Sequence, residues 1–302
     1  MTTAKKRHLT GTDVVFNVIN YSVFFLFTLI CVYPFYYLII NTISSNQLSA
    51  NGEINFLPRE IQFQNYVSIF KLKGLPQSML ISVLRTVIGT VFTVFASAFL
   101  GFMFTQQKMW KRKFWYRFVI ITMYFNAGLI PGFILMYNLH LTNNFLVYIL
   151  PGIVQPFNII LAKTFIESTP KSLQEAAEID GAGILRIFFT IVLPISVPIL
   201  ATIAIFCAVG QWNSFQDTLI YVTDSRLYPL QYLLYTYLNA SNSLAQLIRN
   251  NPSMSGSAIA SLANRQTPTS VRMTISVIVV IPILVVYLSL IHISEPTRPE
   301  RI

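Results

Sequence analysis

The chain has 302 residues, of which 54% are hydrophobic and 11% are charged, and its formal net charge is +10. Soluble proteins carry about 25% charged residues, so this composition excludes an ordinary water-soluble protein and indicates a polytopic membrane protein. The basic residues cluster at the ends of apolar segments. Membrane topology and anionic lipid explain that distribution more simply than a nucleic-acid partner does.

Six apolar blocks are long enough to cross a hydrocarbon core of about 30 Å, which requires roughly 20 helical residues. We therefore expect an all-α fold, with a six-span domain over residues 16–290 after a cytoplasmic N-terminus of residues 1–15. The expected spans are residues 16–40, 78–104, 115–137, 145–166, 187–209 and 273–290. Glycines and prolines inside the third and fourth blocks are tolerated because neighbouring helices re-satisfy the backbone.

The lysines and arginines near these blocks predict the orientation. They lie at Lys5, Lys6 and Arg7, and after the second block at Lys108, Lys111, Arg112, Lys113 and Arg117. Because positive loops favour the cytoplasm, both termini are expected inside, with residues 41–77 and 211–272 outside. Residues 167–186 then lie inside. The first apolar block is too long for a cleaved signal peptide and is expected to stay as an anchor.

Motifs for catalysis and for metal binding are absent from the sequence. It contains no Gly-x-x-x-x-Gly-Lys-Ser/Thr loop, no Gly-x-Ser-x-Gly elbow and no His-Glu-x-x-His helix. Its two cysteines, Cys31 and Cys207, and its three histidines have no metal-ligand spacing. We therefore expect no catalytic residues, no metal site and no cofactor bound by this chain.

A short polar segment interrupts the apolar sequence between the fourth and fifth blocks. Ser172 and Glu175 have capping-box spacing, which predicts that a helix begins there. Ala176 and Ala177 favour helix and let another surface approach closely. Gly181 is expected to adopt the left-handed conformation that ends a helix. A polar helix on the cytoplasmic side of a membrane protein is a surface for a cytoplasmic partner.

This segment resembles the EAA loop of ABC importer permeases. The matching residues are Glu175-Ala176-Ala177, Asp180-Gly181-Ala182, Phe188, Ile191, Leu193-Pro194 and Pro198. The Asp-Gly-Ala variant is similar to that of the carbohydrate-type subfamily, which includes maltose-type permeases. The pairs Trp212-Asn213 and Asn65-Tyr66 and the six-span plan are also similar, so the resemblance covers about residues 10–287.

The resemblance implies that residues 167–186 carry a coupling helix, which lies in a cleft of a cytoplasmic ATPase. The implied docking residues are Glu175, Ala176, Ala177, Asp180, Gly181 and Ala182, with Leu193 and Pro194 fixing the angle to the fifth span. The implied partners are a second six-span permease, an ATPase dimer that uses ATP and Mg²⁺, and an extracytoplasmic solute-binding protein. The implied location is the cell membrane. A plain amphipathic connector is the alternative reading of this loop.

Polar or amphipathic side chains in or at the outer ends of spans three to five are candidates for the solute path. They are Asn126, Gln155, Gln211, Trp212 and Asn213. An amide beside an aromatic ring suits the hydroxyls and C–H faces of a sugar. Such amides also tie membrane helices together, at about 1 kcal/mol each or less, and we favour that structural role for any single one.

The roles of Arg85 and of four residues of the long outer loop stay open. Arg85 is the only charge well inside an apolar block, and we expect its long stem to reach the membrane interface, although intramembrane charges are often functional. The long outer loop offers Asp217, Asp224, Arg226 and Tyr228 as contacts for a binding protein. A solvated flap explains these four residues equally well.

Residues 291–302 are expected to be a non-native tail. Ser294 to Ile302 resembles translated sequencing-adapter read-through, where relatives continue with a short basic tail. The predicted function is the permease subunit of an ATP-driven carbohydrate importer, forming half of the translocation pathway. The alternatives are an ABC permease for a peptide or polyamine, and an ion-coupled secondary carrier, which would need no ATPase.

Overall fold

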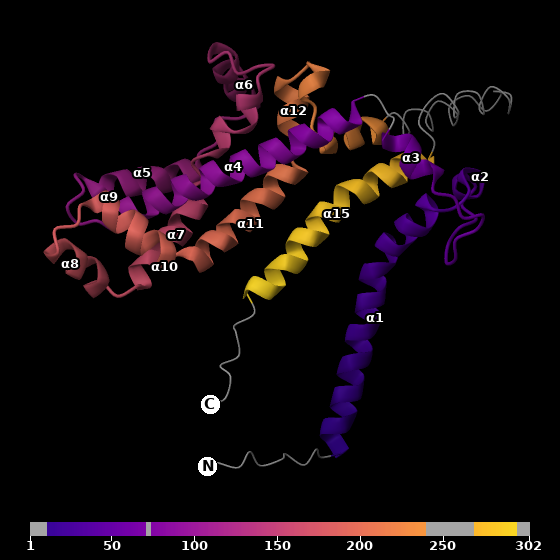
Figure 1. Cartoon of the computed structure of the whole chain (residues 1–302), viewed down its shortest axis with the longest axis horizontal. Helices are drawn as coiled ribbons and strands as arrows, with labels where there is room; N and C mark the ends of the chain where they lie inside the picture. The colour runs from indigo at the N-terminus through magenta and orange to yellow at the C-terminus, as the bar shows by residue number, and fades with distance from the viewer. Residues whose placement is uncertain (1–10, 71–73, 240–268, 295–302) are drawn as a thin grey trace. The chain divides into compact units, whose positions relative to one another are not determined.

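The computed structural model describes residues 11–70, 74–239 and 269–294 (Figure 1). Every regular element in these ranges is helical, as the all-α prediction requires. The contacts divide the chain into two units, residues 1–69 with 241–278 and residues 70–240 with 279–302. The lysines and arginine of the N-terminus, the Ser-rich part of the outer loop and residues 295–302 of the expected non-native tail lie outside the described residues.

The first unit is built around α1 (Gly11–Thr42), which contains the first expected span. Its polar C-terminal end is buried and hydrogen-bonded by the loop that follows it, which includes α2 (Asn46–Ala50) and leads into α3 (Gln64–Phe70). Asn65 Nδ2 donates to the Thr42 carbonyl at 2.9 Å, and the Tyr66 hydroxyl lies 2.8 Å from Thr42 Oγ1. The Asn65-Tyr66 pair therefore fixes the end of α1.

The centre of the second unit is α4 (Leu75–Met103), which packs against α7 (Pro156–Ser168) and α11 (Val197–Asn213). Small residues let these helices approach closely, as is common between membrane helices. A Cβ at Gly101 would lie only 2.9 Å from the Ala162 Cβ. Phe102, Phe188 and Ile203 fill the buried core beside this contact.

The third, fourth and fifth expected spans are all broken. The third consists of α5 (Arg112–Tyr124) and α6 (Leu129–Asn138), bent by 118°. The fourth joins η1 (Phe145–Tyr148) and η2 (Leu150–Gly152) to α7 at 46°. The fifth joins α9 (Ile184–Ile187), η3 (Phe188–Val192) and α10 (Leu193–Ile195) to α11 at 79°.

Glycine and proline explain two of these breaks. Gly128 precedes α6 with a φ of 91°, a left-handed conformation that side chains disfavour. Pro156 begins α7, where its missing N–H is harmless and the preceding residue is held extended. Gly128 and Pro156 therefore mark breaks between helices, whereas Pro131 lies in the first turn of α6.

In the described ranges, α1 and α4 are the two unbroken helices long and apolar enough to cross a membrane. The three bent pairs would raise this number to five if each is one span. The last expected span falls in α15 (Thr269–Ser294). The helices match the six predicted blocks in place, and the count of six spans stays a prediction.

Candidate functional site

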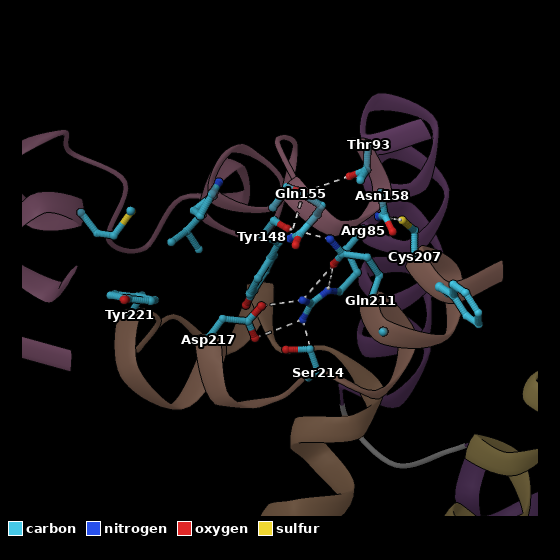
Figure 2. A pocket seen from close by; sticks show the side chains of 16 residues that line it. Arg85, Thr93, Tyr148, Gln155, Asn158, Cys207, Gln211, Ser214, Asp217 and Tyr221 are labelled. Atoms are coloured by element: carbon cyan, nitrogen blue, oxygen red, sulfur yellow. Dashed lines mark hydrogen bonds and ion pairs between the residues drawn. The ribbon is translucent and has the colours of Figure 1, made fainter. Parts of the chain in front are cut away.

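A cavity of about 470 Å³ lies among the broken helices of the second unit (Figure 2). Its walls come from α4, α6, the η1–η2 segment, α7, α11 and α12 (Gln216–Tyr221). The polar and aromatic side chains that line it are Arg85, Thr93, Tyr148, Gln155, Asn158, Phe206, Gln211, Ser214, Asp217 and Tyr221. This volume is in the range of sites for small molecules.

The Arg85 guanidinium is the most heavily bonded group in this wall. Its Nε and Nη2 both donate to Gln211 Oε1, at 3.3 and 3.1 Å. Nη1 donates to the Ser214 carbonyl at 3.1 Å and to Asp217 Oδ1 at 3.3 Å, and Nη2 donates to Asp217 Oδ2 at 2.5 Å. One side chain of α4 thereby holds the end of α11 and the start of α12 together.

Tyr148 and Gly89 complete the surroundings of Arg85. The guanidinium carbon lies 4.4 Å from the centre of the Tyr148 ring, a favourable cation–π arrangement. The Tyr148 hydroxyl donates to the Leu227 carbonyl at 2.9 Å. Gly89 leaves room for the Gln211 amide, because a Cβ there would lie 2.8 Å from Gln211 Nε2. Gln211 is therefore fixed on both sides, by Gly89 and by Arg85.

The prediction that Arg85 reaches the membrane interface is wrong. Its side chain is 1% exposed and forms an ion pair with Asp217. Asp217, which the sequence suggested as a contact for a binding protein, instead lines the cavity. The available signal was a single acidic residue shortly after the fifth span, opposite in charge to the only cation inside a block. Nothing in the sequence showed that the two residues meet.

The structure brings two of the five solute-path candidates to the cavity, Gln155 and Gln211. Trp212 is buried away from it, and its Nε1 donates to the Val279 carbonyl at 3.0 Å. Asn126 Oδ1 accepts a hydrogen bond at 2.9 Å from the backbone N–H of Gly128, at the break between α5 and α6. Asn213 is exposed and does not line the cavity.

Sequence reasoning missed several groups that line this cavity. Asn158 is 7% exposed, and its Nδ2 donates to the Cys207 sulfur at 3.3 Å. Phe206 and Tyr221 contribute aromatic surface, and Tyr221 stacks on Phe133 of α6 with ring centres 6.1 Å apart. Asn158 was recognisable as an amide inside the fourth block. The aromatic residues were not, because such blocks contain many of them.

The expected coupling loop contains a short helix, α8 (Ser172–Ile179), at the C-terminal end of α4 (Figure 1). The capping-box prediction is wrong, because Lys171 is the N-cap and no side chain caps the helix. Ser172 therefore lies inside the first turn. Gly181 has a φ of 78°, as predicted for the residue that ends this helix. Glu175, Ala176, Asp180 and Gly181 are exposed, and Ile179 is 86% exposed.

The opposite side of α8 is attached to the end of α4 and to the core. Gln106 Nε2 donates to Gln174 Oε1 at 3.1 Å, and Lys108 Nζ forms an ion pair with Glu178 at 2.6 Å. Ala177, Ala182 and Leu193 pack against the core around Phe188, while Pro194 is exposed. A second cavity, of about 400 Å³, lies between α8 and residues 105–112. The six residues expected to dock the ATPase, and the two expected to fix the angle to the fifth span, thus divide into exposed residues and residues packed against the core.

The other outer-loop candidates form a compact surface near α12. Asp224 pairs with Arg226 at 2.8 Å, and this hydrogen-bonded guanidinium lowers the pKa of the Asp224 carboxyl. Asn143 Oδ1 accepts from the backbone N–H groups of Thr223 and Asp224, at 2.6 and 3.0 Å. The Tyr228 hydroxyl donates to the Thr223 carbonyl at 3.1 Å. Side chains from two loops therefore hold this turn in one conformation.

Comparison with known proteins gives consistent similarities. Residues 94–297 match the family described as binding-protein-dependent transport system inner membrane component. The polygalacturonan/rhamnogalacturonan transport system permease protein YtcP of Bacillus subtilis is 33% identical over 90% of this chain and 92% of its own length. The arabinooligosaccharides transport system permease protein AraQ of Halalkalibacterium halodurans is 31% identical over 69% and 77%.

A solved structure is also similar over almost the whole chain. It is described as a bacterial ABC transporter involved in the import of the acidic polysaccharide alginate. Its matching chain is 26% identical, with a TM-score of 0.82, and the match covers 95% of this chain and 99% of that one. The similarity therefore extends well beyond the matched family segment on its N-terminal side.

Proposed function

Because this chain belongs to the family of binding-protein-dependent transport system inner membrane components, we propose that it is the permease subunit of an ATP-driven carbohydrate importer. It is a membrane transport subunit and not an enzyme. The observation that carries the proposal is that α4 is attached to two sites, the cavity at Arg85 and the anchor of α8 just beyond Met103. About 27 Å of helix connects them at 1.5 Å per residue.

The chemistry of the cavity suits a carbohydrate. Gln155 and Asn158 offer amide groups for hydroxyls, and Phe206 and Tyr221 offer rings for C–H faces. The named relatives are permease proteins of transport systems for polygalacturonan, rhamnogalacturonan and arabinooligosaccharides, and the similar structure comes from an alginate importer. These names support an oligosaccharide as cargo. Gln155 is the better candidate for cargo contact than Gln211, whose amide is already engaged by Arg85 and the Tyr148 carbonyl.

The proposed assembly contains this chain, a second six-span permease, a cytoplasmic ATPase dimer and an extracytoplasmic solute-binding protein. ATP and Mg²⁺ are used by the ATPase, and both termini of this chain lie in the cytoplasm. Glu175, Ala176, Asp180 and Gly181 form the exposed ATPase-docking surface, which we extend to Ile179 because of its 86% exposure. Ala177, Ala182 and Leu193 support that surface from the core side.

Coupling would follow from the anchor between α8 and α4. When the ATPase moves α8, the contacts of Gln174 with Gln106 and of Glu178 with Lys108 transmit the displacement to the end of α4. Because α4 is a continuous helix, its movement reaches Arg85 and the cavity wall. The cavity could then open alternately to the two sides of the membrane, as a carrier requires.

The test is uptake of a labelled oligosaccharide by cells or vesicles that lack their own permease and contain the other three components. The wild-type chain should support uptake that requires ATP. Glu175→Lys should abolish uptake while the protein stays in the membrane at normal amounts. The matched control is Glu60→Lys, which changes an exposed acid of the first unit and should leave uptake near wild type. Full uptake by Glu175→Lys would contradict the docking role.

Two alternatives make different predictions in the same assay. A permease for a peptide or polyamine would also depend on ATP, but it would take up none of the labelled oligosaccharides that its binding protein presents. An ion-coupled carrier would continue after ATP depletion and would stop when an uncoupler removes the ion gradient. The family assignment and the exposed side of α8 favour the ATP-driven importer over the ion-coupled carrier.

A further inference from the structure

Among the described residues that line the cavity, Arg85 and Asp217 are the charged ones, and they are paired with each other. We infer that Asp217 is a specificity-determining residue, which masks the charge of Arg85 so that the cavity selects uncharged, hydroxyl-bearing sugar units over carboxylate-bearing ones. This inference rests on the proposed function and concerns the kind of sugar that this chain contacts. By this inference, the chain selects a different kind of sugar from relatives that are named for acidic polysaccharides.

The hydrogen bonds of Arg85 leave no donor for a carboxylate cargo. A guanidinium has five N–H groups, and the five bonds to Gln211, Ser214 and Asp217 use all of them. One face of the guanidinium lies over the Tyr148 ring. With a side chain only 1% exposed, Arg85 is a structural cation of the cavity wall and is not available as an anion receptor.

Asp217 is held in place on the other side of the pair. Its Oδ1 also accepts a hydrogen bond at 2.9 Å from the backbone N–H of Thr218, at the start of α12. Its side chain is 22% exposed, against 1% for Arg85, so the carboxylate is the member of the pair that solutes approach. A second carboxylate in the cavity would therefore meet like charge before it reached the guanidinium, and like charges at short range repel.

The remaining polar groups of the cavity are neutral. Gln155 is exposed, and its Nε2 makes one long hydrogen bond of 3.4 Å to the Gly152 carbonyl. Asn158 uses its Nδ2 on Cys207, which leaves its amide oxygen as an acceptor for a hydroxyl. Amides both donate to and accept from sugar hydroxyls. Because the described lining residues include no free cation, these amides favour a neutral sugar over an acidic one of the same shape.

Cys207 lines the same cavity and can report its local charge. Cys31, the other cysteine, is exposed on α1 and would be replaced by serine in all variants. The experiment compares the rates at which Cys207 reacts with two methanethiosulfonates of similar size, one anionic and one cationic, in the membrane-embedded complex. The ratio of the two rates cancels effects on thiol reactivity that both reagents share, so it measures the electrostatic potential at the cavity.

With Asp217 in place, the ratio of anionic to cationic rates should match that of a small neutral thiol within a few-fold. Asp217→Asn should raise this ratio about tenfold, the change that corresponds to roughly 1.4 kcal/mol, because the Arg85 charge is no longer masked. The matched control, Arg85→Gln with Asp217→Asn, restores a neutral wall and should return the ratio to that of the wild type. Cys207→Ser should remove all labelling and so identify the reacting residue.

A ratio that already favours the anionic reagent tenfold with Arg85 and Asp217 both in place would overturn the inference, and this measurement needs only the Cys31→Ser protein. An unchanged ratio in Asp217→Asn would also overturn it. So would a failure of both reagents to modify Cys207, since the cavity would then be closed to solutes.

Transport supplies the second readout. Uptake of a neutral galacto-oligosaccharide should exceed uptake of a galacturonate oligosaccharide of the same length, and Asp217→Asn should shift this preference about tenfold toward the galacturonate. A wild-type preference for the galacturonate would overturn the inference. If no sugar is transported at all, the proposed function fails, while the labelling ratio still decides whether Asp217 masks Arg85.

Discussion

The Arg85 guanidinium and the Asp217 carboxylate form an ion pair between α4 and α12, although 132 residues separate them in the sequence. The pair connects the helix that leads to the α8 anchor with the turn that closes one wall of the cavity. Gln211 and Ser214 accept the remaining Arg85 hydrogen bonds, so this network fixes the geometry of the joint between α11 and α12.

Removal of the Asp217 charge should destabilise the protein. Breaking a buried ion pair from one side commonly costs about 3–5 kcal/mol, and the 22% exposure of Asp217 places the expected loss toward the lower end of this range. The thermal midpoint of detergent-solubilised Asp217→Asn should fall clearly below that of the wild type. The control is Asp224→Asn in the exposed pair with Arg226, which should change the midpoint little. Equal midpoints for the two variants would contradict a stabilising role of the buried pair.

Gly89 should not tolerate a side chain. A Cβ at this position would lie 2.8 Å from Gln211 Nε2 and 3.0 Å from Gln211 Cδ, so Gly89→Ala must displace the amide that holds Arg85. We expect a loss of about 1–3 kcal/mol, which is typical of overpacking. Gly210→Ala is the matched control, because a Cβ there meets nothing within 4 Å. Thermal midpoints of both variants check this prediction, and a stable Gly89→Ala protein would show that Gln211 can move away.

The Lys108–Glu178 pair should affect coupling more than stability. Its side chains are 77% and 40% exposed, and such surface pairs contribute less than about 1 kcal/mol. Lys108→Glu should nevertheless reduce uptake per ATP hydrolysed, since it places two acids together where α8 meets the end of α4. Combining Lys108→Glu with Glu178→Lys should restore much of that ratio. No recovery in the double variant would mean that the individual residues matter and their pairing does not.

Substitutions at Gln155 and Trp212 should have different effects, the first on cargo affinity and the second on protein stability. Gln155→Ala should raise the apparent KM for uptake several-fold at an unchanged thermal midpoint, because the side chain is exposed in the cavity. Trp212→Phe should lower the thermal midpoint and leave the apparent KM unchanged. It removes the hydrogen bond to the Val279 carbonyl, worth about 0.5–1.5 kcal/mol, and leaves the cavity lining unchanged. An unchanged KM for Gln155→Ala would remove this residue from the solute path.

The sequence by itself determined the features that depend on local chemistry. The sparse charges and long apolar blocks indicated a membrane protein of helices, and the polar segment with Gly181 predicted a short helix and its end. The spacing of the Glu-Ala-Ala and Asp-Gly-Ala residues identified the family without any structural information. Each of these signals lies within a few residues of the feature that it predicts, which is why it could be read directly.

Only the tertiary structure decided the geometry of the cavity and the state of its charges. Whether Arg85 reaches the interface or is buried depends on the carboxylate of Asp217, which follows 132 residues later. No local sequence pattern shows that these two residues pair. The bends of 118° and 46° occur at glycine and proline, but their angles, like the 79° bend of the fifth expected span, depend on contacts with neighbouring helices that a continuous apolar block does not reveal. The sequence pattern therefore identified the helices and the family, whereas long-range packing placed Arg85, neutralised by Asp217, in the wall of the cavity.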